Sequence, residues 1–258
     1  MVGVQAPLDG QVAVVTGAGR GLGRYVAFAL ASFGAEVVVV SRTSGEIHET
    51  VRAIEHDGGK AVGHVTDVSR AAEVEKFGHA VRRDVDFVSI LVNSAGVIDP
   101  IAPLTATDPD LWIRNVMVNL AGTYLMIRHF LPHMVARDYG RIVNISSISA
   151  TRPTRSWTAY ASAKAAVDQL TRCLALELVG TGVTVCSFNP RRIDTNMQAR
   201  IRSVSPEDYP DVVEAQAAYR EGKLQDPRLP AGVIARLATP SAQFNGRTLA
   251  MGDPLDLS

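Results

Sequence analysis

The chain has 258 residues, of which 47% are hydrophobic, and its 26 Lys and Arg residues balance its 26 Asp and Glu residues. This neutral, apolar-rich composition argues against a nucleic acid or a membrane surface as the main binding partner. No apolar run reaches the ~18 residues of a membrane-spanning helix, and residues 1–10 lack the apolar core of a secretory signal. Cys173 lies in a helical pattern and Cys186 in a strand-like run, so both are predicted to be buried free thiols, which fits a cytoplasmic protein.

Strand-like and helical patterns alternate along the whole chain. Short runs rich in β-branched residues predict strands at 11–16, 35–40, 61–65, 87–92, 141–146, 183–188 and 247–251. Helical spacing predicts helices at 22–33, 47–54, 71–85, 111–135 (interrupted or ended near Pro132), 159–179 and 230–238. The alternation predicts an α/β fold, with one doubly wound, Rossmann-type parallel sheet, helices on both faces, and a single domain over residues 1–258.

Residues 191–225 break this alternation. The segment is polar and predicts two short helices, at 196–202 and 211–221. It follows the carboxyl end of a strand, where open α/β sheets bind ligands, so we expect a substrate lid there. A packing arm or an oligomer-contact arm is the alternative.

A glycine-rich turn joins the first predicted strand to the first helix, with the sequence Thr16-Gly-Ala-Gly-Arg-Gly-Leu-Gly23. Gly17, Gly21 and Gly23 allow a tight turn and let the backbone approach a pyrophosphate at a helix N-terminus. A purely structural turn would show the same glycines, but the strand–turn–helix context favours dinucleotide binding.

The end of the second strand indicates which dinucleotide is bound. An acidic residue there would accept the ribose hydroxyl of NAD, whereas this chain has Ser41-Arg-Thr43 and no acid before Glu46. Arg42, and Arg20 within the glycine turn, can pair with a 2′-phosphate. NADP is therefore the predicted cofactor, although each arginine alone could be a solvated surface charge.

Two further turns follow strands. Asp67 and Val68 come after the third strand, where the carboxylate could accept a hydrogen bond from the adenine amine or could cap the next helix. The turn Asn93-Ser-Ala-Gly96 follows the fourth strand and brings small residues to the cofactor crevice, although a structural turn is a rival interpretation.

The residues suited to proton transfer are Ser147, Tyr160 and Lys164. Tyr160 and Lys164 are four apart, so on a helix they share one face. A nearby ammonium favours phenolate, so the pair suits a general acid or base, although an exposed helix start would show the same spacing. Ser147 ends a buried strand and could bring its hydroxyl to the same reacting atom. No Gly-x-Ser-x-Gly elbow marks it as a hydrolase nucleophile, and no metal site is expected.

These motifs, in this order, resemble the short-chain dehydrogenase/reductase family over nearly the whole chain. The resemblance implies that Tyr160 protonates a carbonyl oxygen while a nicotinamide delivers hydride to the carbon. It implies that Lys164 lowers the Tyr160 pKa and binds the nicotinamide ribose, and that Ser147 binds the substrate oxygen. Asn119 would hold a water that links Lys164 to solvent. The resemblance also implies cofactor contacts from Leu22, Ala95, Gly96, Ile193 and Thr195.

The chain departs from the family pattern at three places. Ser94 replaces a second Asn, and Met251-Gly-Asp-Pro254 replaces Asp-Gly-Gly near the C-terminus. Asn189-Pro-Arg-Arg192 stands where relatives have Pro-Gly, so we expect Arg191 to disturb a glycine conformation with positive φ beside the nicotinamide.

The C-terminal quarter resembles the sepiapterin/benzil reductase branch, which implies an aromatic or vicinal dicarbonyl substrate. A broad ketone or ketoacyl reductase is the rival. The sequence thus predicts an NADP-dependent carbonyl reductase acting on a small molecule, assembled as a homodimer or homotetramer as in relatives. The alternatives are a non-catalytic NADP-binding sensor or scaffold and an NAD-dependent alcohol dehydrogenase.

Overall fold

The computed structural model describes residues 6–241 and 244–255. Seven parallel strands form one sheet in the order β3-β2-β1-β4-β5-β6-β7. Their bounds are β1 Val12–Thr16, β2 Glu36–Ser41, β3 Lys60–Val65, β4 Ile90–Asn93, β5 Gly140–Ile145, β6 Val183–Asn189 and β7 Thr248–Ala250. This is the predicted doubly wound, Rossmann-type sheet.

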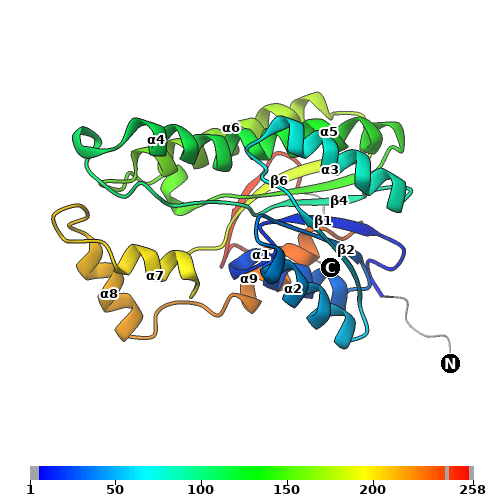
Figure 1. Cartoon of the computed structure of the whole chain (residues 1–258). Helices are drawn as coiled ribbons and strands as arrows, with labels where there is room; N and C mark the ends of the chain where they lie inside the picture. The colour runs from blue at the N-terminus through cyan, green and yellow to red at the C-terminus, as the bar shows by residue number, and fades with distance from the viewer. Residues whose placement is uncertain (1–5, 242–243, 256–258) are drawn as a thin grey trace.

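Helices cover both faces of this sheet (Figure 1). The helices α1 Gly21–Ser32, α2 Ser44–His56 and α9 Arg228–Leu237 lie on one side. On the other side lie α3 Ala71–Asp84, α4 Pro109–Val116, α5 Gly122–Ala136 and α6 Thr158–Glu177. Short 3₁₀ turns occur at η1 Leu104–Ala106 and η3 Ile148–Ala150.

Alternate strand residues feed the two apolar cores between the sheet and its helices. Val15 and Val37 belong to one core, whereas their neighbours Val14 and Val38 belong to the other, and all four are fully buried. Such strands are buried on both faces, which explains why their sequences are continuous apolar runs and not alternating ones.

The long predicted helix is interrupted, but not where its proline lies. α5 continues through Pro132 to Ala136, so the expected break near Pro132 is wrong. The irregularity comes earlier, in the π-helical turn η2 Met117–Ala121, which joins α4 to α5 and contains Asn119. The side-chain amide of Asn119 donates to the carbonyl oxygen (3.0 Å) and to the side-chain oxygen (2.8 Å) of Asn115, which lies in the last turn of α4.

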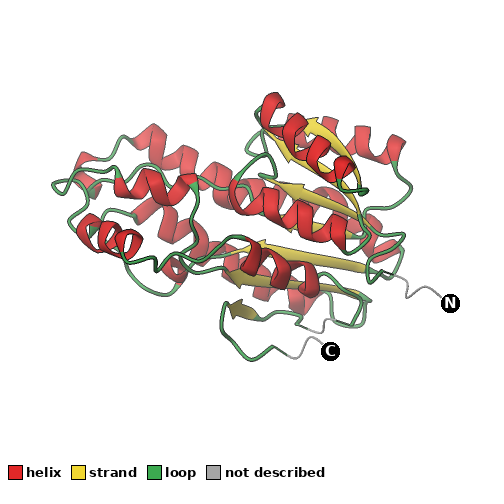
Figure 2. Cartoon of the chain, turned by 90° about the horizontal axis from the view of Figure 1, so that it is seen from below, coloured by secondary structure: helices red, strands yellow, loops and turns green. Residues whose placement is uncertain are grey.

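The segment after β6 leaves the sheet and forms α7 Asn196–Arg202 and α8 Val212–Arg220. Both helices project beyond the sheet (Figure 1), at the end of the molecule towards which the strand arrows point in Figure 2. The two helices predicted at 196–202 and 211–221 are therefore confirmed, and they stand at the carboxyl ends of the strands.

Candidate active site

A cavity of about 590 Å³ lies at the turns that follow the strands. Most of the predicted site residues line it, although they come from seven separate segments of the chain. They are Gly17, Arg20, Gly21, Leu22, Gly23, Arg42, Asp67, Val68, Ala95, Gly96, Ser147, Tyr160, Lys164, Ile193 and Thr195. Two predicted residues, Asn93 and Asn119, are buried in the surrounding structure and do not line the cavity.

The glycine turn after β1 is packed so closely that side chains are excluded from two of its positions. A Cβ on Gly17, whose φ is +67°, would lie 2.8 Å from the Ala95 Cα, and one on Gly23 would lie 2.4 Å from the Gly17 carbonyl oxygen. The Thr16 hydroxyl oxygen accepts hydrogen bonds from the amides of Ser94 and Ala95, both at 3.0 Å. The turns after β1 and β4 therefore form one cradle for a ligand.

Charged residues gather at the β2 and β3 end of this cradle. The Asp67 carboxylate accepts hydrogen bonds from the Ser69 amide (3.0 Å) and hydroxyl (2.7 Å). Burial raises the pKa of Asp67, but these hydrogen bonds, with Arg42 and Arg70 nearby, lower it overall. Asp67 does not cap α3, since Arg70 precedes that helix, so the capping alternative is wrong.

The two buried asparagines organise the backbone around the cavity. Asn93 donates to the Asn144 side-chain oxygen at 2.8 Å and so joins β4 to β5. Asn119 donates to the Val97 carbonyl oxygen at 2.8 Å and accepts from the Val97 amide at 3.3 Å. A Cβ on Gly96 would lie 2.9 Å from Asn119 Oδ1 and 3.9 Å from Lys164 Nζ, so these two polar groups flank the same glycine.

Ser147, Tyr160 and Lys164 meet at the inner wall of the cavity. Tyr160 and Lys164 lie one turn apart on α6 and are both buried, with Lys164 Nζ 5.7 Å from the centroid of the Tyr160 ring. Lys164 Nζ donates to the Ile145 carbonyl oxygen at 2.7 Å, which fixes the ammonium beside the end of β5. Ser147, just after β5, accepts a hydrogen bond from the Ser149 amide at 3.2 Å.

Burial dominates the protonation of this pair. It raises the pKa of Tyr160 to about 12, with the Ser147 hydroxyl acting in the opposite direction. It also lowers the pKa of Lys164 to about 8, although Asp168 opposes the shift. The expected lowering of the Tyr160 pKa is therefore not found, because removing the phenolate from water costs more than the Ser147 hydrogen bond returns. At neutral pH Tyr160 is a protonated phenol.

Arg191 takes up the conformation that a glycine would favour. Its φ is +60°, so the expected loss of a positive φ is wrong. The backbone amide of Arg191 donates to Asn189 Oδ1 at 2.9 Å, and the guanidinium Nε donates to the Met251 carbonyl oxygen at 2.6 Å. Arg191 is exposed and lies at the edge of the cavity, which it helps to line.

An aromatic and aliphatic wall completes the cavity on the side of α7 and α8. Trp157 stacks edge-on against Tyr160, with ring centroids 5.8 Å apart, and lies 5.6 Å from the ring of Tyr209. Ile98 and Ile201 belong to the same apolar cluster. No motif in the sequence marks this wall, because its members come from four segments of the chain; only the position of Trp157, three residues before Tyr160, could have signalled it.

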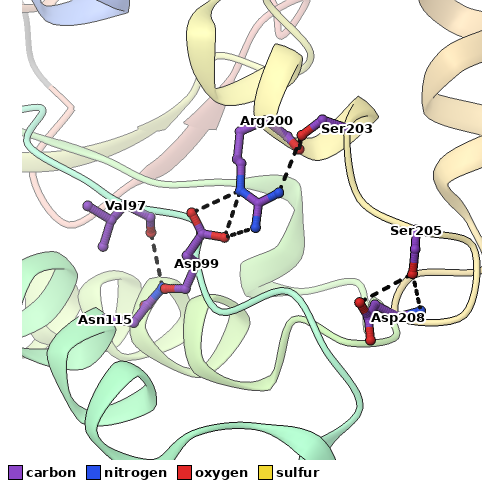
Figure 3. A network of polar contacts seen from close by, with 7 residues as sticks. All are labelled: Val97, Asp99, Asn115, Arg200, Ser203, Ser205 and Asp208. Atoms are coloured by element: carbon purple, nitrogen blue, oxygen red, sulfur yellow. Dashed lines mark hydrogen bonds and ion pairs between the residues drawn. The ribbon is translucent and has the colours of Figure 1, made fainter.

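An ion pair ties α7 to the loop after β4 (Figure 3). Arg200 Nη2 lies 2.8 Å from Asp99 Oδ1, and Arg200 Nε donates to the same oxygen at 3.0 Å. The side-chain amide of Asn115 fixes this loop, because it donates to the carbonyl oxygens of Val97 (3.1 Å) and Asp99 (2.8 Å). The apolar wall is thus linked to the body of the protein by a polar contact at its edge.

Comparison with known proteins gives the family. The sequence profile of the short chain dehydrogenases matches residues 11–205. The chain belongs to this family. A short chain dehydrogenase of Pseudocercospora fijiensis is 34% identical over 249 residues, which cover 94% of this chain and 80% of that protein.

Crystal structures of family members share the whole fold. A 3-oxoacyl (acyl-carrier-protein) reductase from Agrobacterium tumefaciens with NADP bound has a TM-score of 0.84 at 31% identity, covering 94% of this chain and 93% of that one. An actinorhodin polyketide ketoreductase variant with NADPH has a TM-score of 0.84 at 30% identity, with 93% and 95% covered. The resemblance to sepiapterin and benzil reductases stays a prediction.

Membrane-spanning helices, metal-binding groups and cysteines complete the description of the structure. Within the described part of the chain, no helix is long and apolar enough to cross a membrane, and no three His, Cys, Asp or Glu side chains form a metal-binding group. Both cysteines are free thiols. Cys186 is buried as predicted, whereas Cys173 is exposed, because it lies on the outer side of α6.

Proposed function

We propose that this short chain dehydrogenase is an NADPH-dependent carbonyl reductase. The observation that carries the proposal is that Ser147, Tyr160 and Lys164 line the same cavity as the glycine turn. Reductases that bind NADP or NADPH are among the solved structures that share the fold.

The cavity fits a dinucleotide. Gly17 and Gly23 leave no room for a Cβ, so backbone amides can approach a pyrophosphate. Arg20 and Arg42 line the end at which a 2′-phosphate would lie, and Lys164, Ile193 and Thr195 would hold the nicotinamide half. NADPH bound in this way supplies the hydride for the carbonyl carbon.

The side chains at the inner wall would complete the reduction. Ser147 would donate a hydrogen bond to the carbonyl oxygen and orient it towards Tyr160. Tyr160 would give its proton to that oxygen as negative charge develops there. Its raised pKa suits this direction, because the phenol remains protonated at neutral pH. The Lys164 ammonium would stabilise the phenolate that is left, and reprotonation past Asn119 stays a prediction.

The shape of the outer cavity supports a ketone or diketone with an apolar body. Trp157, Met197, Ile201 and Tyr209 face the substrate end, where they could bury an aromatic ring. We propose that residues 191–225 act as the substrate lid of a single domain over residues 1–258, with the Arg200–Asp99 ion pair fastening it.

A substrate panel with both cofactors tests the proposed reaction. We expect oxidation of NADPH with aromatic ketones and diketones, slower turnover with polar sugars, and slower turnover with NADH. Binding of NADPH without turnover across the panel would favour the non-catalytic sensor. Faster NAD-linked oxidation of alcohols would favour the dehydrogenase alternative. The alternative of a non-catalytic sensor arose because Arg191 stands where relatives have glycine. Since Arg191 has the positive φ that a glycine would adopt, we favour the reductase.

We also propose a homodimer or homotetramer in the cytoplasm. The outer faces of α4 and α5 expose apolar side chains, including Ile113 (54%) and Tyr124 (49%), and α6 exposes Leu176 (76%). Two free thiols, one of them exposed, suit a reducing compartment. Analytical ultracentrifugation tests the assembly: a monomer at micromolar concentration would contradict it. Cell fractionation tests the location.

A further inference from the structure

An acidic side chain stands among the cations at the β2 end of the cavity. Glu46, in the first turn of α2, lines the cavity together with Ser41 and Arg42. A Cβ on Gly19 would lie 2.9 Å from the Glu46 Cβ, 3.0 Å from its carboxylate Oε2, and 3.0 Å from the Ser41 hydroxyl oxygen. The carboxylate therefore lies between the glycine turn and the end of β2.

The position of Glu46 is fixed by its helix. The Thr50 hydroxyl, one turn later on α2, lies 3.1 Å from the Ala18 carbonyl oxygen and 3.0 Å from that of Glu46. Thr50 is fully buried, so it fastens the first turn of α2 to the glycine turn. The backbone of Glu46 is therefore held at this end of the cavity.

The charge of Glu46 acts on one of the two arginines. Arg20 Nη1 lies 3.7 Å from Glu46 Oε1, and the Glu46 side chain is only 28% exposed. The Arg42 guanidinium makes no ion pair or hydrogen bond within residues 6–241 and 244–255, although its charge helps to lower the pKa of Asp67. This end of the cavity thus offers a cation that makes no ion pair, Arg42, and a cation that is already paired, Arg20.

We propose that Glu46 is a specificity-determining residue that restrains the preference for NADP over NAD. The inference rests on the proposed dinucleotide site. A 2′-phosphate at the end of β2 would face the Glu46 carboxylate as a like charge and would compete with it for Arg20. A ribose 2′-hydroxyl could instead donate a hydrogen bond to Glu46. In NAD-binding proteins an acidic residue at the end of the second strand accepts this hydrogen bond. Glu46 thereby lets the chain accept both dinucleotides, with Arg42 favouring NADP.

The test compares Glu46→Gln with a matched variant on the same helix. Glu49→Gln also removes a carboxylate of α2 that pairs with an arginine, Arg24 at 3.4 Å, but Glu49 does not line the cavity. Calorimetry measures the binding of adenosine 2′,5′-bisphosphate and adenosine 5′-monophosphate, which report on this end of the cavity without any turnover. Thermal unfolding checks that both variants are folded.

We expect Glu46→Gln to raise the ratio of bisphosphate to monophosphate affinity by about five-fold at low salt, the size of a partly exposed charge interaction. Glu49→Gln leaves the ratio unchanged. An unchanged ratio in Glu46→Gln, or an equal rise in Glu49→Gln, refutes the role of Glu46 while the dinucleotide site stands. Failure of both probes and of NADPH to bind the unaltered chain refutes the proposed function and the inference together.

Discussion

Substitutions of Arg191 test whether the turn after β6 has a positive φ at this residue. With φ at +60°, a residue other than glycine is strained by about 1 kcal/mol or more relative to glycine. The side chain compensates through the hydrogen bond from Nε to the Met251 carbonyl oxygen, which is exposed and contributes about 0.5–1 kcal/mol. Arg191→Ala loses this bond and keeps the strain. Arg191→Gly loses the bond but removes the strain.

We therefore expect Arg191→Gly to be nearly as stable as the unaltered protein and Arg191→Ala to be less stable than Arg191→Gly by about 1 kcal/mol. In a protein of this size that difference corresponds to about 2–4 °C in Tm. Thermal unfolding of the two variants, with and without NADPH, measures it. An Arg191→Ala variant as stable as Arg191→Gly would show that the turn does not use the positive φ, and the path of the backbone past the cavity would have to be redrawn.

Three further predictions concern packing, protonation and the lid. Gly78→Ala should lower the free energy of unfolding by about 1–3 kcal/mol, since its Cβ would lie 1.8 Å from His129 Nε2. Gly232→Ala, whose Cβ would have nothing within 4 Å, should raise that free energy by about 0.5–1 kcal/mol. Urea unfolding compares the two variants, and equal effects would argue against the close contact between Gly78 and His129. Burial lowers the pKa of His129 below 6.5, so on acidification the unfolded chain gains a proton before the folded chain does, and the free energy of unfolding should fall as pH drops below about 6.5. His129→Gln should make the free energy of unfolding less dependent on pH in this range. An unchanged pH dependence would exclude this histidine as its source. Arg200→Ala removes the half-exposed ion pair with Asp99, so Tm should change little. Amide hydrogen exchange at residues 196–225 should become faster. Unchanged exchange would mean that this ion pair does not fasten the proposed lid.

The order of elements and the cofactor cradle follow from local sequence. The central strands β1 and β2 are apolar runs followed by turns, and the strand order β3-β2-β1-β4 brings the turns after β2, β1 and β4 to neighbouring positions at one edge of the sheet. The glycine positions could be predicted because only a residue without a Cβ tolerates the contact between Gly17 and Ala95.

Contacts between distant segments could not be read in the same way. The break in the long helix depends on how Asn119 and Asn115 bond to each other and to Val97, and nothing in the helical periodicity marks it. The apolar wall forms only because the segment after β6 brings Ile201 and Tyr209 to Trp157. Similarly, Glu46 follows the end of β2 by five residues, but its place beside Gly19 depends on how α2 packs. The pKa of Tyr160 also depends on tertiary burial, which raises it, whereas the spacing of Tyr160 and Lys164 suggests a lowered pKa.

The most direct test of the proposed function is the activity of Tyr160→Phe. The substitution removes only the phenolic hydroxyl, so the edge-on packing against Trp157 should persist and NADPH should bind nearly as before by fluorescence titration. With a ketone that the unaltered protein reduces, we expect NADPH oxidation to fall by at least a thousand-fold, of the order that loss of a positioned acid brings. Binding without turnover is the predicted result. Turnover within ten-fold of the unaltered protein would contradict the assignment of Tyr160 as the proton donor.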